Sequence, residues 1–276
     1  MRREIAEDAG FYSYLRIGRR NLVKSIVTVA CGGVAVFFLG GSNGWAASPQ
    51  VANVDTATVT YDSGGTNISA FIAKPNGAGK HRAIIVVHDT QGLSDDIRDT
   101  AKMFAAEGFV ALAPDMLSRS GGAKSPEQTV AAVRGLAPMD TVADLQAAFA
   151  YLLNSPDVDS GKISVVGYGW GGWRSFMLAT VTPNLYRVVI YSGATPIPDQ
   201  PLKDIKSPVL GNYGQYDYQN AGNVIWTTKT MKELGKKYTS YIYPNAMAGF
   251  YNPKGRQYDA EAAKTAWTRT LEFLKS

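Results

Sequence analysis

The sequence is poor in the residues from which proteins build redox and metal centres. Its 276 residues include one cysteine, Cys31, and two histidines, His81 and His88. A single cysteine cannot close an intramolecular disulfide or supply a zinc site of several thiolates. Two histidines seven residues apart, around a predicted strand, are too few to hold a metal alone. We therefore expect no metal and no organic cofactor.

Charge is also sparse and is unevenly distributed. Charged residues make up 18% of the chain, and the formal net charge is +5. Residues 1–48 carry six basic and three acidic side chains, so this segment holds +3 of that charge. The rest of the chain is close to neutral and has no basic stripe interleaved with aromatics. These features exclude nucleic acid as an expected partner.

One long segment has no charge at all. Between Lys24 and Asp55 no charged residue occurs, and the apolar run 26–39 lies at its centre. A helix from Lys24 to Trp45 would be roughly 31 Å long, close to the hydrocarbon thickness of a bilayer. Trp45 suits the far interface. Residues 25–46 therefore predict a transmembrane anchor in contact with lipid, after a basic cytoplasmic segment, 1–24.

A cleaved export signal is the alternative for the same segment. Residues 18–24, GRRNLVK, resemble a twin-arginine signal, and Ala46 precedes a tolerable cleavage site. Because basic flanks stay in the cytoplasm, both interpretations place the chain after about residue 47 on the periplasmic side. The first gives a single-pass inner-membrane protein, and the second gives a soluble periplasmic one. The sequence leaves the choice open.

After a polar linker, 47–55, strands and helices alternate through a domain at 56–276. An opening hairpin is expected from Ala57–Tyr61 and Ile68–Ala73. Continuous apolar runs typical of strands buried on both faces follow at 83–87, 109–113, 163–166, 188–190 and 209–210. Helical spacing occurs at 97–104, at 142–152 after an Asp140 cap, at 224–234 and at 260–274. This order predicts an α/β fold, a mostly parallel sheet with helices on both faces.

A glycine-rich turn follows the third of these runs. Residues 165–172 read VVGYGWGG, which matches the strand-turn-helix of a G-x-nucleophile-x-G elbow. The outer glycines, Gly167 and Gly171, are the ones that allow strand and helix to approach closely. Gly169 stands at the nucleophile position, where it has no side chain to present.

Three further segments carry a family resemblance. They are HDTQGL at 88–93, AEGFVALAPD at 106–115 and YPNAMAGFYN at 243–252. With the elbow, they occur in the order found in the dienelactone hydrolase family of the α/β-hydrolase fold, which the chain resembles over about residues 55–276.

The resemblance implies a Cys, Asp, His triad, and two of its three positions are changed. Gly169 replaces the cysteine, Ala248 replaces the histidine, and Asp217 falls where the acid belongs. No histidine occurs beyond His88, so the standard relay cannot be assembled. Ser175, further along the elbow helix, is expected to be an ordinary helix serine. No catalytic residue is expected.

Parts of a polar pocket are nevertheless predicted above the elbow. Asp89 stands where the family has a glutamate, and Arg119 matches a position that can hold a substrate carboxylate. With Asp217 and the backbone at Trp170, they could line a site for a small molecule. The alternative is that these residues are turn-stabilising and surface charges.

These observations favour a non-catalytic, membrane-anchored dienelactone-hydrolase-like domain. Its role would be that of an accessory or interaction subunit of a bacterial membrane complex, for example an electron-transfer or photosynthetic one, with protein partners. Two alternatives stay open. One is an exported hydrolase of a small ester or lactone with a non-standard site, and the other is a periplasmic binder of small carboxylates.

Overall fold

A computed structural model describes residues 54–122, 125–195 and 202–276. The predicted segments 1–24 and 25–46, and the linker up to residue 53, lie outside the described residues. The strands are β1 (Val54–Ser63), β2 (Thr66–Pro75), β3 (His81–Val87), β4 (Phe109–Pro114), β5 (Val158–Tyr168), β6 (Val188–Tyr191), β7 (Val209–Tyr216) and β8 (Tyr238–Met247). The α-helices are α1 (Asp95–Ala106), α2 (Pro126–Gly135), α3 (Pro138–Leu153), α4 (Trp170–Val181), α5 (Ala221–Glu233) and α6 (Ala260–Lys275).

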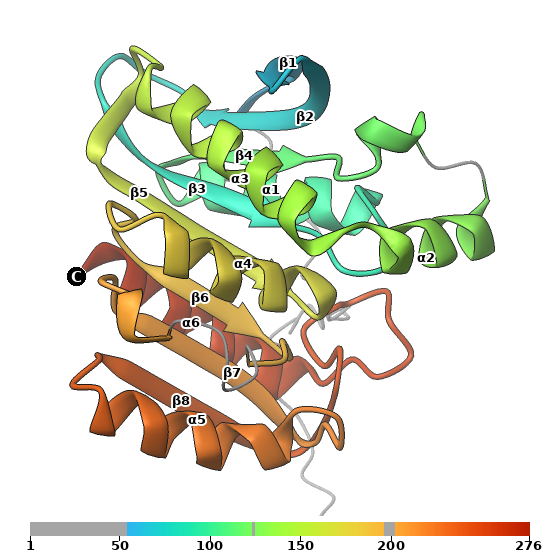
Figure 1. Cartoon of the computed structure of the whole chain (residues 1–276), viewed down its shortest axis with the longest axis vertical. Helices are drawn as coiled ribbons and strands as arrows, with labels where there is room; N and C mark the ends of the chain where they lie inside the picture. Colours follow the sequence, from blue (N-terminus) through green and yellow to red (C-terminus); the bar gives the residue numbers. More distant parts are fainter. Residues whose placement is uncertain (1–53, 123–124, 196–201) are drawn as a thin grey trace, which may run out of the picture. The chain divides into compact units, whose positions relative to one another are not determined.

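The strands form one sheet in the order β1-β2-β4-β3-β5-β6-β7-β8 (Figure 1). Only the β1–β2 and β2–β4 pairs are antiparallel, and the remaining pairs are parallel. The expectation of a mostly parallel sheet is therefore confirmed. Because parallel strands end at one edge, the loops after β3, β5, β7 and β8 emerge on the same side of the sheet, where α/β folds carry their sites.

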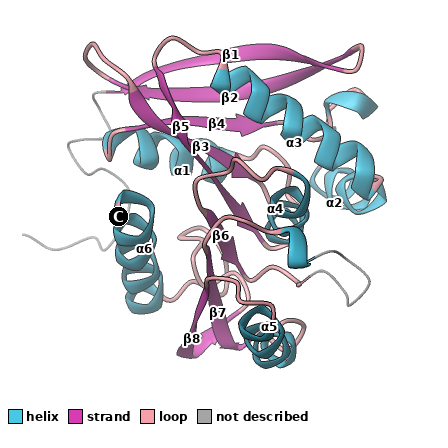
Figure 2. Cartoon of the chain, turned by 60° about the vertical axis from the view of Figure 1, so that its left-hand side comes forward, coloured by secondary structure: helices cyan, strands magenta, loops and turns pink. Residues whose placement is uncertain are grey.

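Helices cover both faces of the sheet, as expected (Figure 2). On one face α1 and α6 pack over a core that includes Phe104, Val166 and Phe250. On the other face α3, α4 and α5 pack over a second core that includes Val165, Phe176 and Met231. Val165 and Val166 are adjacent in β5 and point to opposite faces, which explains why the central strands are apolar without alternation.

The opening hairpin is confirmed and is longer than predicted. β1 and β2 pair over ten residues each, so Val54 and Asp55 belong to the strand and the linker ends earlier than residue 55. The turn uses Gly64 and Gly65, both at positive φ, as tight hairpin turns between right-twisted strands require.

One expectation about local structure is wrong, and two elements were not predicted. Asp140 does not cap α3, because Pro138 occupies the first helical position with its φ already fixed, and Asp140 lies in the first turn. Helix α2 was not predicted, since few apolar residues mark its face. Strand β8 was not predicted either, because this half-exposed edge strand is interrupted by Pro244 and Asn245.

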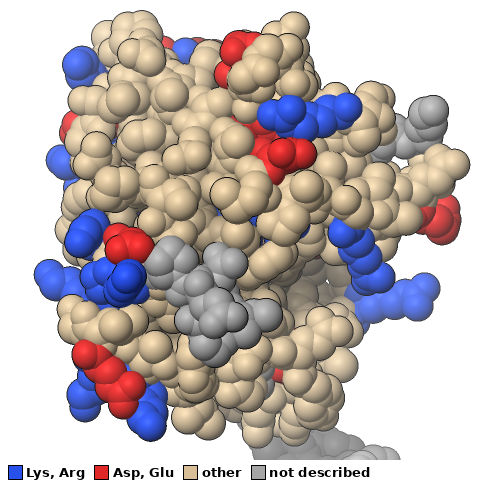
Figure 3. Space-filling model, viewed as in Figure 1, with Lys and Arg blue, Asp and Glu red and all other residues tan. Residues whose placement is uncertain are grey.

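Within the described ranges, no helix has the length and apolar character needed to cross a membrane. On the face shown in Figure 3, the described basic side chains are interspersed with acidic ones towards the margins and form no continuous stripe.

Candidate functional site

The elbow brings β5 and α4 into close backbone contact. A Cβ atom at Gly167 would lie 2.2 Å from the carbonyl oxygen of Gly171. A Cβ at Gly171 would lie 2.3 Å from the carbonyl oxygen of His88. Neither position can hold a larger residue without moving the backbone, so these two glycines are required by packing.

Gly169 differs from its neighbours because it has room. A Cβ atom there would meet only the Asp89 Cβ at 3.6 Å and the Tyr251 Oη at 3.7 Å, which are ordinary contacts. The backbone keeps the positive φ of a nucleophile elbow, with φ 52° and ψ −111°. The position therefore retains the geometry of a nucleophile site and lacks the reacting atom.

The acid position is occupied by a buried carboxylate with an amide partner. Asp217, 1% exposed, accepts two hydrogen bonds from Nδ2 of Asn220, at 2.9 Å to Oδ1 and 3.1 Å to Oδ2. Burial raises the pKa of Asp217, and the hydrogen bonds from Asn220 oppose that rise. An amide can orient a carboxylate, but it cannot relay a proton as an imidazole does.

The nearest imidazole is fixed in place by the backbone. His88 is fully buried, its Nε2 accepts a hydrogen bond from the amide of Met116 at 3.2 Å, and its Nδ1 therefore donates to the carbonyl of Asp89 at 2.7 Å. Burial lowers the pKa of His88 and keeps it neutral. Both nitrogens are in use, so His88 does not replace the missing base.

Ala248 lies in the turn after β8, half-buried, and presents only a methyl group. Ser175 Oγ is buried on α4, where it has no hydrogen-bond partner in the structure and would lie 2.3 Å from a Cβ at Gly167. It therefore packs beneath the elbow, away from the open side of Gly169, as the sequence predicted.

The charges of Asp89 and Asp217 both act on one tyrosine, Tyr251, that the sequence did not single out. Burial, followed by the charges of both carboxylates, raises the pKa of Tyr251 well above its usual value. Burial also raises the pKa of Asp89, whose Oδ1 accepts a hydrogen bond from the amide of Gln91 at 2.7 Å. No local sequence pattern identifies Tyr251 as a site residue. It lies at the elbow because the loop after β8 returns towards Gly169.

The loop that carries Tyr251 is tied to α1. Nδ2 of Asn252 donates to Asp96 at 2.9 Å, and Lys254 pairs with the same carboxylate at 2.8 Å. The Tyr251 ring packs against Tyr168 and Tyr191, with centroid separations of 5.0 and 5.4 Å. These contacts hold the phenol at the elbow.

Arg119 is placed elsewhere than the other predicted pocket residues. Its Nη2 lies 2.6 Å from Oδ1 of Asp144, a carboxylate with no solvent exposure, and its Nε donates to the same carboxylate. Nη1 and Nη2 also donate to Thr66 and to Ser63 at the end of the opening hairpin. The guanidinium thus ties α3 to the hairpin. Of the predicted set, Trp170 directly follows Gly169, the Asp89 Cβ lies 3.6 Å from a Cβ at Gly169, and Asp217 is linked to this place through its charge, which acts on Tyr251.

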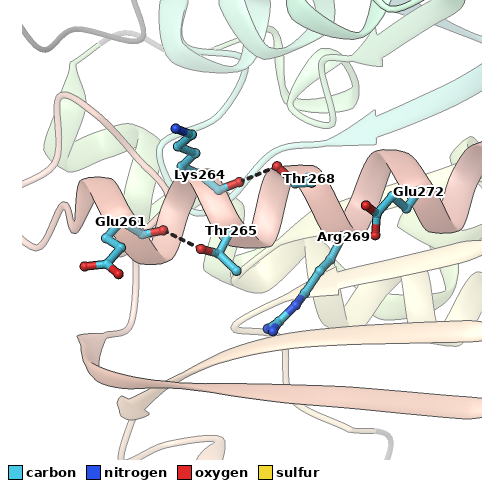
Figure 4. Close-up of a pocket in the computed structure, with 6 residues that line it drawn as sticks. All are labelled: Glu261, Lys264, Thr265, Thr268, Arg269 and Glu272. Carbon is cyan, nitrogen blue, oxygen red and sulfur yellow. Dashed lines mark hydrogen bonds between the residues drawn. The ribbon is translucent and has the colours of Figure 1, made fainter.

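A cavity of about 450 Å³ lies along the outer side of α6, away from the elbow (Figure 4). All six residues that line it belong to that helix, and Arg269 among them stacks on the ring of Tyr241 at 3.9 Å. The cavity shares no residue with the elbow. In the part of the chain that the structure describes, no three Cys, His, Asp or Glu side chains are grouped as a metal site requires.

Comparisons with known proteins agree with this geometry. A model of the dienelactone hydrolase family matches residues 68–276. Proteins named "Putative carboxymethylenebutenolidase" from Saccharolobus solfataricus and Methylorubrum extorquens are each 29% identical, over 79% and 75% of this chain and 97% and 76% of their own. A crystal structure described as a "Putative Dienelactone Hydrolase", from Klebsiella pneumoniae, superposes with a TM-score of 0.74 at 24% identity, over 81% of this chain and 99% of that one.

Proposed function

The chain belongs to the dienelactone hydrolase family, and on that premise we propose that its domain binds a small ester- or lactone-like molecule over Gly169 without forming a covalent bond to it. The observation that carries this proposal is the open space at Gly169, where a side chain would fit and none is present. The Tyr251 hydroxyl and the Asp89 side chain border that space, and the charges of Asp89 and Asp217 both act on Tyr251.

Covalent chemistry of the acyl-enzyme type requires a nucleophile and a base that exchanges its proton. Gly169 supplies no nucleophile, Ala248 supplies no base, and both nitrogens of His88 are engaged with the backbone. What remains is a polar site that orients a carbonyl compound, with backbone donors at the start of α4.

Hydrolysis by direct attack of water is the second candidate, and the names of the relatives support it. A carboxylate of Asp89 or Asp217 would take a proton from water as the water oxygen bonds to the ester carbonyl carbon. The Tyr251 hydroxyl would donate a hydrogen bond to the oxyanion, and the leaving alkoxide would receive the proton. The products are one acid and one alcohol. Burial raises the pKa of both carboxyls, which makes each a stronger base than an ordinary carboxylate.

One experiment separates the two candidates. The purified domain is titrated with a neutral aromatic lactone, while thermal stability and product formation are both followed. Ligand-dependent stabilisation without product supports binding alone, and turnover that disappears in Asp217→Asn or Asp89→Asn but survives in the exposed control Asp204→Asn supports hydrolysis. The absence of both stabilisation and product would contradict both candidates.

We also propose that the domain is held at the periplasmic face of the inner membrane by residues 25–46 and works there as an accessory subunit with protein partners. The support is the uncharged apolar segment and the lost triad, both read from the sequence. Mass spectrometry of the N-terminus of the natural protein, with detergent extraction and analysis of co-purifying chains, tests this. A cleaved, monomeric product would overturn it.

A further inference from the structure

Arg174 is a buried cation with an incomplete set of hydrogen-bond partners. It lies on α4 and is 2% exposed, the largest fully buried side chain among the described residues. Its Nη2 donates to the carbonyl of Leu136 at 3.2 Å, whereas its Nε and Nη1 have no acceptor. No local pattern singles it out, since arginine side chains are mostly exposed.

Among the described residues, no carboxylate forms an ion pair with Arg174. Burial alone lowers its pKa to about 10, with no contribution from a carboxylate, so it stays charged at neutral pH. Arg119, by contrast, meets Asp144 with three hydrogen bonds. An unpaired buried charge is costly, and proteins that keep one usually pair it or bind a counter-ion.

Two tryptophans flank the guanidinium. The Cζ of Arg174 lies 4.4 Å from the ring centroid of Trp170 and 4.0 Å from that of Trp173. Such stacking offsets part of the desolvation cost and occupies the faces of the planar group. It supplies no acceptor for the N–H groups, which point outward at the edge of a guanidinium. A ligand with acceptor oxygens would satisfy them.

Arg174 lies on the same helix as the elbow, close to its N-terminal end. Trp170 directly follows Gly169, and four residues of helix, roughly 6 Å of rise, separate Trp170 from Arg174. The N-terminus of α4 adds its own positive potential near the same place. The Trp170 ring also stacks with the His88 ring, parallel within 10° at a centroid distance of 5.8 Å.

We propose that Arg174, between Trp170 and Trp173, is an oxyanion-binding subsite that takes the carboxylate or phosphate group of a small ligand. The ligand of the proposed function would then be an anionic ester or lactone. Its anionic group binds at Arg174, and its ester or lactone group lies over Gly169; this second contact rests on the proposed function. The ligand carboxylate is thus held by a residue other than Arg119.

The test measures thermal unfolding and tryptophan fluorescence of the domain in sodium phosphate and in sodium acetate, with sodium chloride at equal ionic strength as the reference. We expect the melting temperature to rise with the logarithm of the concentration of one or both oxyanions, with a saturating fluorescence change from the flanking tryptophans. A response to phosphate only, or to acetate only, identifies the preferred group.

The variant Arg174→Met removes the charge and keeps the volume, and it should abolish both responses. The control Arg134→Met, on the exposed side of α2, removes the same charge and should retain them. If Arg174→Met does not fold, Arg174→Lys is used, and an apparent affinity at least tenfold weaker than that of the wild type is expected because the point charge cannot reproduce the planar group.

An oxyanion response that is missing in the wild type, or unchanged in the Arg174 variant, would overturn the subsite. The two proposals fail separately. Stabilisation by a neutral lactone without any oxyanion response rejects the subsite and leaves the proposed function, whereas an oxyanion response without lactone binding does the reverse.

Discussion

The hydroxyl oxygen of Tyr251 lies 3.7 Å from the point that a Cβ atom at Gly169 would occupy. The two residues are 82 positions apart and meet because the loop after β8 returns over the carboxyl end of β5. The phenol therefore faces the open position of the elbow, and its burial, followed by the charges of Asp89 and Asp217, raises its pKa and keeps it protonated. A hydrogen-bond donor is present where a carbonyl ligand would lie.

Restoring the missing groups tests whether the site geometry has survived. In a chain with Cys31→Ser, the double variant Gly169→Cys with Ala248→His should show an ionised, reactive thiol at neutral pH and measurable ester turnover, because a neighbouring imidazole lowers a thiol pKa. Alkylation rates against pH provide the measurement. The single variant Gly169→Cys is the control and should react at least tenfold more slowly. Equal rates would mean that residue 248 does not reach the elbow.

The elbow glycines should differ in their tolerance of a methyl group. Gly167→Ala forces a Cβ to within 2.3 Å of both the Gly171 carbonyl and Ser175 Oγ, so we expect a loss of more than about 4 kcal/mol in the free energy of unfolding, or no folded protein. Gly169→Ala meets no close contact and incurs only the strain of positive φ, about 1–3 kcal/mol. Denaturant unfolding of both variants measures the contrast. Similar losses in the two variants would contradict the conclusion that Gly167 is required by packing whereas Gly169 has room for a side chain.

Arg119 should act on stability and not on ligand binding. Because Asp144 has no solvent exposure, Arg119→Met leaves a buried carboxylate without its partner, at a cost of about 3–5 kcal/mol. Arg256→Met, at an exposed position, should change the unfolding free energy by less than about 0.5 kcal/mol. If Arg119→Met unfolds like the wild type but loses ligand response, Arg119 belongs to the binding site after all.

The raised pKa of Asp217 predicts a particular pH dependence. When the native pKa of a carboxyl exceeds its unfolded value, the native state binds more protons, so this group's contribution to stability is largest below the unfolded pKa and is lost as pH rises through the native pKa. Relative to Asp217→Asn, the wild type should therefore lose stability as pH rises from about 4 towards neutrality, by about 1.4 kcal/mol for each unit of elevation. Asp204→Asn, at an exposed position, is the control for the loss of one carboxylate. A difference of opposite slope would mean that hydrogen bonds to the carboxylate outweigh its burial.

The sequence predicted the parts of this fold that depend on local pattern. Runs such as 83–87 and 109–113 are buried strands because no polar residue interrupts them, and Gly167 and Gly171 could be assigned to close packing because only glycine permits it. β8 escaped prediction because an edge strand needs little apolar character and because Pro244 interrupts its pattern.

The site was less accessible to sequence reasoning because its members meet through tertiary contacts. Asp89 and Asp217 were identified by resemblance, but their common neighbour Tyr251 is set by the path of one loop. Arg119 occupies the expected position in the chain and pairs with Asp144, a contact that no local spacing indicates. Arg174 became notable only once its two unpartnered nitrogens were located inside the protein.

A domain that lacks both nucleophile and base should form no covalent intermediate with a carbonyl compound, and intact-protein mass spectrometry can detect such an intermediate. The natural chain is incubated with an activated ester such as p-nitrophenyl acetate and quenched over a time course. The account predicts that no transient acyl adduct forms on any residue around Gly169, whereas the variant with Gly169→Cys and Ala248→His acquires one. A stoichiometric adduct on the natural chain that maps to that site and then turns over would contradict it.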